Sequence, residues 1–249
     1  MELIFITLLG TAVGSFLNVL ILRIPKEESI SFPASHCMSC NTPLRVWHNI
    51  PLFSWLFLRG KCSFCGAKIS SQYPVIEALS GLIFLFSTLK LGISFQALTT
   101  ALVFEMLLAL SVIDFRYKMV PDSLNLLALT LAVAGAGSLV QLGYNFTHAL
   151  LFAGGFTLLR FYLSYFLKKE AMGEADIMIA ATMGALLGVQ LALAAIFLSA
   201  LLALPALLLT QDESEDSKQL PFIPFLAMAT WIVLMFDTYV STYMAGLYG

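Results

Sequence analysis

The sequence predicts an all-α membrane protein, a polytopic bundle of about eight transmembrane helices with one small loop domain. Hydrophobic residues make up 59% of the 249 residues and charged residues only 11%, against about 25% charged residues in a soluble domain. Mean hydropathy is +0.90, and the apolar residues gather in runs of about 20, the length that crosses a bilayer. So few polar residues cannot cover a water-facing surface. This excludes a soluble globular protein, a disordered chain and a free nucleic-acid-binding protein.

The first predicted span opens the chain. A cleavable signal peptide would carry basic residues before its apolar run, whereas here Glu2 is the early charge and Arg23 and Lys26 follow the run. Seven further runs qualify as spans, and the sixth span is short and nearly joins the seventh. The eight predicted spans are residues 2–22, 75–93, 95–114, 120–141, 147–167, 174–189, 191–210 and 221–246. We therefore expect a first transmembrane helix at 1–22, a loop at 23–74 and a helix bundle at 75–249.

Lysine and arginine residues set the orientation of these spans. Eleven of the 13 fall on one side of the membrane, whereas Lys90 lies on the other side and Arg160 lies within a span. The eleven are Arg23, Lys26, Arg45, Arg59, Lys61, Lys68, Arg116, Lys118, Lys168, Lys169 and Lys218. The positive-inside rule then predicts that the 23–74 loop is cytoplasmic and both termini lie outside. The acidic stretch 211–218 is interpreted as a solvated cytoplasmic turn.

All four cysteines lie in the predicted cytoplasmic loop, as two C-x-x-C pairs with 21 residues between them: Cys37-Met38-Ser39-Cys40 and Cys62-Ser63-Phe64-Cys65. This spacing is typical of a four-thiolate zinc site, which would be structural because four sulfur ligands leave no position for water. Asn41 and Gly66, which follow the pairs, suit turns with left-handed backbone. The alternatives are two disulfides or a redox pair, which a cytoplasmic location disfavours. His36 and His48 are expected to lie near the metal without binding it.

Two aspartates at the edge of the membrane are the candidate catalytic residues. Asp114 ends the third predicted span and Asp176 begins the sixth, so both are expected at the cytoplasmic face. Two carboxyls within hydrogen-bonding distance share a proton, and the pair can activate water and protonate a leaving group, as in an aspartic protease. Gly173 would let a substrate backbone approach closely.

Each acid also has a simpler interpretation. Asp176 suits a helix N-terminus, whereas Asp114 suits a helix C-terminus badly unless neighbouring basic residues compensate. Asp122 follows Pro121, so a helix cap is its leading interpretation and assistance to the site the alternative. Three further acids are not assigned to the site: Glu77, Glu105 and Asp237.

These residues resemble the bacterial type IV prepilin peptidases, membrane aspartic proteases of the G-x-G-D class. The resemblance covers almost the whole chain and rests on the order and spacing of several motifs. They are Gly14-Ser15-Phe16-Leu17-Asn18-Val19 with Arg23-Ile24-Pro25, the cysteine loop with Asn49-Ile50-Pro51, Tyr73-Pro74 with Glu77, Asp114 with Val120-Pro121-Asp122, Gly173-Glu174-Ala175-Asp176 with Met183-Gly184, and Pro221-Phe222-Ile223-Pro224. The chain departs from the family pattern at Ala175, Met178 and His48-Asn49.

The resemblance implies a reaction and its partners. Family members remove the short basic leader from prepilins or pseudopilins at the cytoplasmic face of the inner membrane, in type IV pilus or type II secretion assembly. Many then methylate the new N-terminus with S-adenosylmethionine. Asp114 and Asp176 correspond to the catalytic pair, Gly173, Glu174 and Asp122 would position substrate, and Glu170 with Glu174 would attract the basic leader. A transporter that relays ions through membrane acids and a methyltransferase or scaffold without protease activity are the alternatives.

Overall fold

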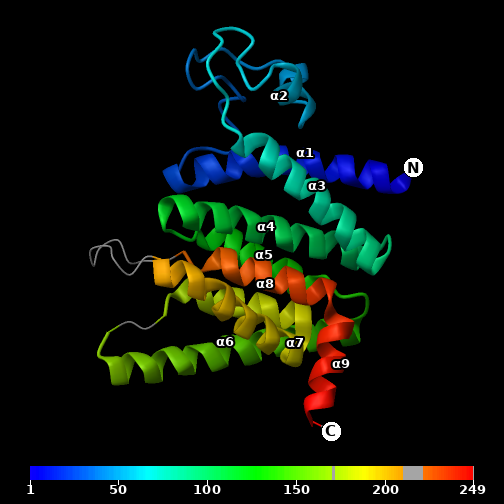
Figure 1. The fold of residues 1–249 in the computed structure, drawn as a ribbon, viewed down its shortest axis with the longest axis vertical. Coiled ribbons are helices and arrows are strands. Elements are labelled where there is room, and N and C mark those ends of the chain that lie inside the picture. The colour runs from blue at the N-terminus through cyan, green and yellow to red at the C-terminus, as the bar shows by residue number, and fades with distance from the viewer. Residues whose placement is uncertain (170–171, 210–220, 249) are drawn as a thin grey trace. The chain divides into compact units, whose positions relative to one another are not determined.

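The structure, a computed structural model, describes residues 1–169, 172–209 and 221–248 of the chain. Every named element in these residues is a helix, which confirms the all-helical class (Figure 1). Contacts divide the chain into two compact units, Met1–Ala97 and Leu98–Gly249. The expected division at 1–22, 23–74 and 75–249 follows presumed roles rather than contacts and stays a prediction.

The first unit is built on two long apolar helices, α1 (Glu2–Arg23) and α3 (Gln72–Leu91), which pack against each other. Glycines bring the two backbones close together. A Cβ atom on Gly14 would lie 2.6 Å from Ser80 Oγ, and one on Gly10 would lie 2.8 Å from the Ser80 carbonyl oxygen. Such a spacing of small residues is a common way to pack helices in a membrane, where no hydrophobic effect drives them together.

Between α1 and α3 the chain forms the cysteine loop, which contains three short helical segments. They are η1 (Ile24–Lys26), η2 (Val46–His48) and α2 (Phe53–Phe57). Polar contacts join α1 to the start of α3, where the loop ends: Gln72 Nε2 donates to Asn18 Oδ1 at 3.1 Å, and Asn18 Nδ2 donates to the Tyr73 carbonyl at 3.3 Å.

The second unit contains six helices: α4 (Phe95–Tyr117, from Leu98 onward), α5 (Asp122–Ala134), α6 (Leu139–Leu167), α7 (Glu174–Leu209), α8 (Ile223–Met235) and α9 (Asp237–Tyr248). Helix α7 packs against α5, α6 and α8 and so holds the unit together. Helix α4 meets α8 through an edge-to-face contact between Phe104 and Trp231, whose ring centroids are 4.6 Å apart.

Helix α7 contains the predicted sixth and seventh spans. Gly188 interrupts it with φ 72° and ψ 179°, a non-helical backbone. In Figure 1 both ends of α7 lie at the same end of the unit, so the chain reverses at Gly188 and returns. The two halves are therefore separate helices, as the sequence predicted, with the turn at Gly188, two residues before the break at residue 190 between the predicted spans.

Five helices are long and apolar enough to cross a membrane, or six if α8 and α9, which are bent by 83°, make one span. This count takes α7 as one helix and leaves out the shorter apolar helix α5. Helix α5 is shorter than the predicted 120–141 because glycines follow it and Ser138, whose Oγ accepts from Gln141 N–H at 3.2 Å, starts α6 early. The acidic stretch 211–218 and Glu170 lie outside the described residues.

Candidate active site and metal centre

The two cysteine pairs sit on two copies of the same turn in the first unit. In the first copy Cys37 N–H donates to the Thr42 carbonyl at 3.0 Å, and in the second Cys62 N–H donates to the Ala67 carbonyl at 2.8 Å. Asn41, with φ 53°, and Gly66, with φ 71°, adopt the left-handed backbone that the sequence predicted for both positions. Each turn therefore aims its two sulfur atoms in the same local direction.

The four sulfur atoms converge on one point. The Sγ atoms of Cys37, Cys40, Cys62 and Cys65 all lie within 4.8 Å of one another, and Cys37 Sγ and Cys65 Sγ are 3.9 Å apart. A tetrahedral ion with metal–sulfur bonds of about 2.3 Å needs sulfur–sulfur distances of about 3.8 Å. The cluster can therefore hold a metal ion with little adjustment.

Hydrogen bonds favour the thiolate form that binds metal. The backbone N–H groups of Ser39 and Cys40 lower the pKa of the Cys37 thiol. The Thr42 hydroxyl and its backbone N–H lower the pKa of Cys40 in the same way. At Cys65 the Ala67 N–H also lowers the pKa, but burial and the three neighbouring thiols outweigh it and raise the pKa to about 11. The pKa is thus lowered at three of the thiols and raised at the fourth, because four crowded sulfur atoms compete for negative charge.

The two histidines near the cysteines contact other groups. His48 Nε2 lies 3.2 Å from Ser63 Oγ, and His48 Nδ1 accepts from the Arg45 backbone N–H at 3.3 Å. His36 Nδ1 lies 3.0 Å from the Ala34 carbonyl. His48 therefore ties η2 to the second cysteine turn, and neither histidine belongs to the group of possible metal ligands.

Asp114 lies one turn before the end of α4, which extends three residues beyond the predicted third span. Its side chain is buried, and Oδ2 accepts a hydrogen bond from the Ile223 backbone N–H at 3.2 Å. Ile223 is the first residue of α8, where N–H groups lack partners within the helix and the dipole favours negative charge. The start of α8 therefore stabilises the Asp114 carboxylate, which the C-terminal end of α4 disfavours.

Asp176 lies in the first turn of α7 and is half-buried. Its Oδ2 accepts from the Gly173 backbone N–H at 3.3 Å, so the residues before the helix fold back over the carboxyl group. A Cβ atom on Gly173 would lie 3.4 Å from that oxygen, in ordinary van der Waals contact. Glycine at this position leaves one side of the Asp176 carboxylate open.

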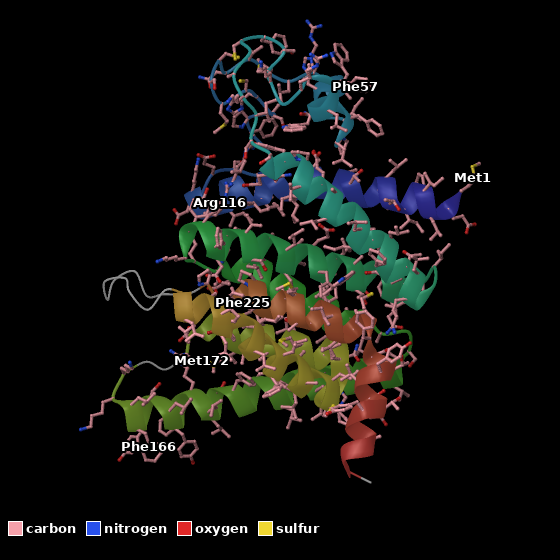
Figure 2. All side chains as sticks on the ribbon, in the orientation of Figure 1. Met1, Phe57, Arg116, Phe166, Met172 and Phe225 are labelled. Atoms are coloured by element: carbon pink, nitrogen blue, oxygen red, sulfur yellow. The ribbon has the colours of Figure 1, made fainter. Side chains whose placement is uncertain are left out.

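The two aspartates belong to the second unit, although 61 residues separate them in sequence. Figure 2 labels three neighbours of the site, namely Arg116 at the end of α4, Met172 before α7 and Phe225 near the start of α8, and all three lie at the same end of the unit. Two carboxyl groups that come within hydrogen-bonding distance of each other can share a proton and activate a water molecule.

Two further residues support this site: Asn125 was missed in the sequence, and Arg160 was expected within a span but without its partner. Asn125 of α5 is fully buried, and its Nδ2 donates to the Ala175 carbonyl at 3.1 Å, next to Asp176. Arg160 of α6 forms an ion pair with Glu174, with Nη1 and Oε1 3.0 Å apart. An asparagine within an apolar helix is the signal that could have identified Asn125. Glu174, the partner of Arg160, lies 14 residues away on another helix, and the sequence pattern does not show this pairing.

The remaining predicted positions lie around the aspartates. Glu174 is exposed apart from its ion pair with Arg160. Asp122 is exposed and is the first residue of α5, whereas Pro121 occupies the N-cap position. The interpretation of Asp122 as a helix cap is therefore wrong by one residue: the side chain lies in the first turn, where the helix dipole still favours an acid.

Comparison with known proteins agrees with this arrangement. Residues 8–91 match the family described as Bacterial Peptidase A24 N-terminal domain, and residues 101–208 match the Type IV leader peptidase family. Three bacterial relatives are each named prepilin leader peptidase/N-methyltransferase. The protein of Stutzerimonas stutzeri is 35% identical over 95% of this chain and 91% of its own length. The protein of Xanthomonas campestris is 34% identical over 90% of this chain and 88% of its own length. The protein of Pseudomonas aeruginosa is 33% identical over 95% of this chain and 91% of its own length.

No solved structure matches the chain. The long apolar helices and the two family matches agree on a multi-pass membrane protein. The two matched regions together with relatives that align over most of their length decide the family: the chain belongs to the type IV leader peptidase family.

Proposed function

We propose that the protein removes the leader from prepilins or pseudopilins at the cytoplasmic face of the bacterial inner membrane, in assembly of a type IV pilus or a type II secretion system. The observation that carries this proposal is the presence of Asp114 and Asp176 in one helical unit, each carboxyl held by a backbone N–H. It rests further on the relatives, whose names describe prepilin processing. The excess of Lys and Arg on the same side of the membrane supports the cytoplasmic location.

The two aspartates divide the proton transfers between them. In the proposed mechanism the ionised carboxylate takes a proton from water, which attacks the carbonyl carbon of the scissile peptide bond. The protonated carboxyl donates its proton to the carbonyl oxygen. The carboxyl that took a proton from water later passes that proton to the leaving amine. The Ile223 N–H at Asp114 and the Gly173 N–H at Asp176 hold the two carboxyls in place. Because substrate and enzyme share the bilayer, the depth of the scissile bond is fixed and encounter costs less entropy.

Three neighbouring residues are assigned to substrate positioning. Gly173 gives the substrate backbone room beside Asp176, because no side chain covers the carboxylate there. Glu174 and Asp122 are exposed acids at the same helix ends and attract the basic residues of a leader. Since Arg160 neutralises part of the Glu174 charge, Asp122 makes the larger contribution.

The four cysteines are assigned to a structural zinc ion. Their sulfur atoms fit a tetrahedral ion, and four thiolates leave no open position for a substrate or water. The ion would connect the two cysteine turns and so give shape to a loop that lacks a large core. We assign a second activity, N-methylation of the new N-terminus, because the relatives carry N-methyltransferase in their names. S-adenosylmethionine would supply the methyl group.

The experiment is mass spectrometry of a prepilin incubated with the purified protein in lipid nanodiscs, with and without S-adenosylmethionine. The proposal predicts loss of the leader under both conditions and one added methyl group only with S-adenosylmethionine. An intact prepilin after incubation with folded, metal-loaded protein would refute the peptidase activity. Glu174→Lys in the same assay should slow cleavage of a basic leader and leave a leader with its basic residues replaced by glutamine unaffected.

A further inference from the structure

The cysteine loop carries a patch of large, exposed apolar side chains. Within η2 and α2 five side chains are more than half exposed: Val46 (83%), Trp47 (58%), Phe53 (52%), Leu56 (62%) and Phe57 (83%). Aromatic and aliphatic groups of this size are rarely left in water together. We call these five residues the apolar face of the loop. Figure 2 labels Phe57 on α2.

The apolar face is one surface because η2 and α2 are held together. Ser54 Oγ donates to the Trp47 carbonyl at 2.7 Å, which fixes the start of α2 against η2. Trp55 points the other way: its Nε1 donates to the Ile69 carbonyl at 3.3 Å, and its ring lies against Gly60. Helix α2 therefore has one side packed on the loop and one side free of it, the pattern of an amphipathic segment.

A buried carboxylate places this face beside a membrane-spanning helix. Leu52, which directly precedes α2, donates its backbone N–H to Glu77 Oε2 at 2.7 Å. Glu77 is buried in the second turn of α3, whose Val75 and Leu79 side chains are 52% and 40% exposed, as on a helix that faces lipid. Leu52 holds φ at 63° and ψ at −52°, a strained backbone for a residue with a side chain, so the junction is held tightly. Helix α2 thus begins beside the first turns of α3, a helix long and apolar enough to cross a membrane.

The charged residues of the segment that bears the apolar face are all basic. Residues 45–61 contain Arg45, Arg59 and Lys61, all exposed, and no aspartate or glutamate. The Arg45 guanidinium lies over the Trp47 ring, 5.4 Å from its centroid. Basic side chains beside tryptophan and phenylalanine favour the boundary between anionic headgroups and acyl chains, where the rings are buried and the charges meet phosphate.

We propose that the apolar face inserts into the headgroup–acyl boundary of the bilayer and that Arg45, Arg59 and Lys61 bind anionic lipid headgroups. The lipid surface would hold the cysteine loop at a fixed depth beside α3. Two contacts then fix the loop, the Leu52–Glu77 hydrogen bond from within the protein and the lipid from outside. This inference does not depend on the peptidase assignment.

Tryptophan fluorescence tests the proposal in the full chain. The variant Trp55→Phe/Trp231→Phe leaves Trp47 as the single tryptophan, and the protein is placed in nanodiscs whose lipids carry bromine near the glycerol end or near the chain terminus. We expect blue-shifted emission that is quenched more strongly by the shallow bromines. Adding Leu56→Glu/Phe57→Glu should shift the emission to that of tryptophan in water and remove the quenching. The matched control, Ile30→Glu/Phe32→Glu, alters two other exposed apolar residues of the loop and should change neither.

Two results would overturn the proposal. Water-like emission without quenching would show that the face lies in solvent. Blue-shifted emission without bromine quenching would show that protein covers it, either the second unit or another chain. For the charges, Arg59→Gln/Lys61→Gln should weaken quenching in nanodiscs of anionic lipid and leave it unchanged in zwitterionic lipid. If the protein that retains Arg59 and Lys61 were quenched equally in anionic and in zwitterionic lipid, the headgroup contacts would be refuted. Metal content, measured on each variant, confirms that the loop remains folded.

Discussion

The cysteine cluster and the aspartate site differ in how far along the chain their parts come from. Each cysteine turn closes within about six residues through its own backbone, and the two turns repeat the same hydrogen bonds. The aspartate site instead draws on three helices: Asp114 on α4 receives its hydrogen bond from α8, 109 residues away, and Asp176 sits at the start of α7.

Because of this difference, the geometry of the cysteine cluster and the geometry of the aspartate site should depend on different parts of the molecule. The cysteine turns depend on left-handed residues and on a metal that joins them, so their geometry should survive changes in the helix bundle. The aspartates depend on the helix ends that surround them, so their geometry should respond to changes in α5 and α8 and ignore changes in the cysteine loop.

The largest effect should come from the aspartates. Asp114→Asn or Asp176→Asn removes the acid–base function but preserves the size of the side chain, so leader removal should fall by about a thousandfold. Quantitative mass spectrometry of a prepilin measures the rate. Metal content and thermal stability serve as controls and should match the unaltered protein. Loss of metal in either variant would contradict the expected independence of the cysteine cluster from the aspartate site.

The next largest effect should be on metal content. Cys37→Ser removes one of four sulfur ligands and should reduce bound zinc from about one ion per chain to almost none. Ser39→Ala, which changes an exposed side chain between two ligands, is the matched control and should retain the ion. Elemental analysis of the purified protein decides the outcome. Full zinc occupancy in the Cys37 variant would contradict the four-sulfur assignment.

The sequence predicted local features well and distant contacts poorly. The cysteine spacing and the left-handed positions Asn41 and Gly66 follow from a few neighbouring residues, and the structure confirms the turns. The reversal at Gly188 and the start of α7 before Asp176 were also visible as breaks in apolar runs. The contact between Asp114 and the start of α8 was not, because no periodicity links a backbone N–H to a carboxylate on a distant helix.

The ends of the helices were also predicted poorly from the sequence. Hydropathy alone extended the fourth span to residue 141, whereas α5 ends at Ala134 and α6 begins at Leu139. It also joined residues 221–246 into one span, although α8 and α9 meet at 83° near Asp237. Apolar character continues through such a bend, and only the packing of the helices determines where it occurs.

A smaller effect is expected at Asn125. Asn125→Leu keeps the volume and removes the hydrogen bond to the Ala175 carbonyl, so kcat should fall about tenfold with little change in KM. Thermal stability should hold or rise because a buried amide is replaced by an apolar group. Asn145→Leu is the matched control, since Asn145 Nδ2 makes the same kind of bond to the Ala132 carbonyl near the other end of α5. Equal losses of kcat in both variants would mean that Asn125 acts only on the fold.

The smallest effect concerns the pH dependence of metal binding. The Thr42 hydroxyl lowers the pKa of Cys40, so its removal in Thr42→Val raises that pKa and lets protons displace the metal at higher pH. The midpoint of metal release on acidification should rise by about half a pH unit. Thr42→Ser retains a hydroxyl and should release metal as the unaltered protein does. A midpoint that falls in Thr42→Val would contradict the role of the hydroxyl.

The most direct test of the central proposal is the rate of leader removal by the Asp114→Asn/Asp176→Asn double variant, measured beside both single variants with enzyme in excess over prepilin. If the two carboxyls work as one unit, the second substitution costs almost nothing, and all three variants cleave at similar residual rates. Losses that multiply in the double variant, or a normal rate in either single variant, would contradict the assignment of Asp114 and Asp176 as one catalytic pair.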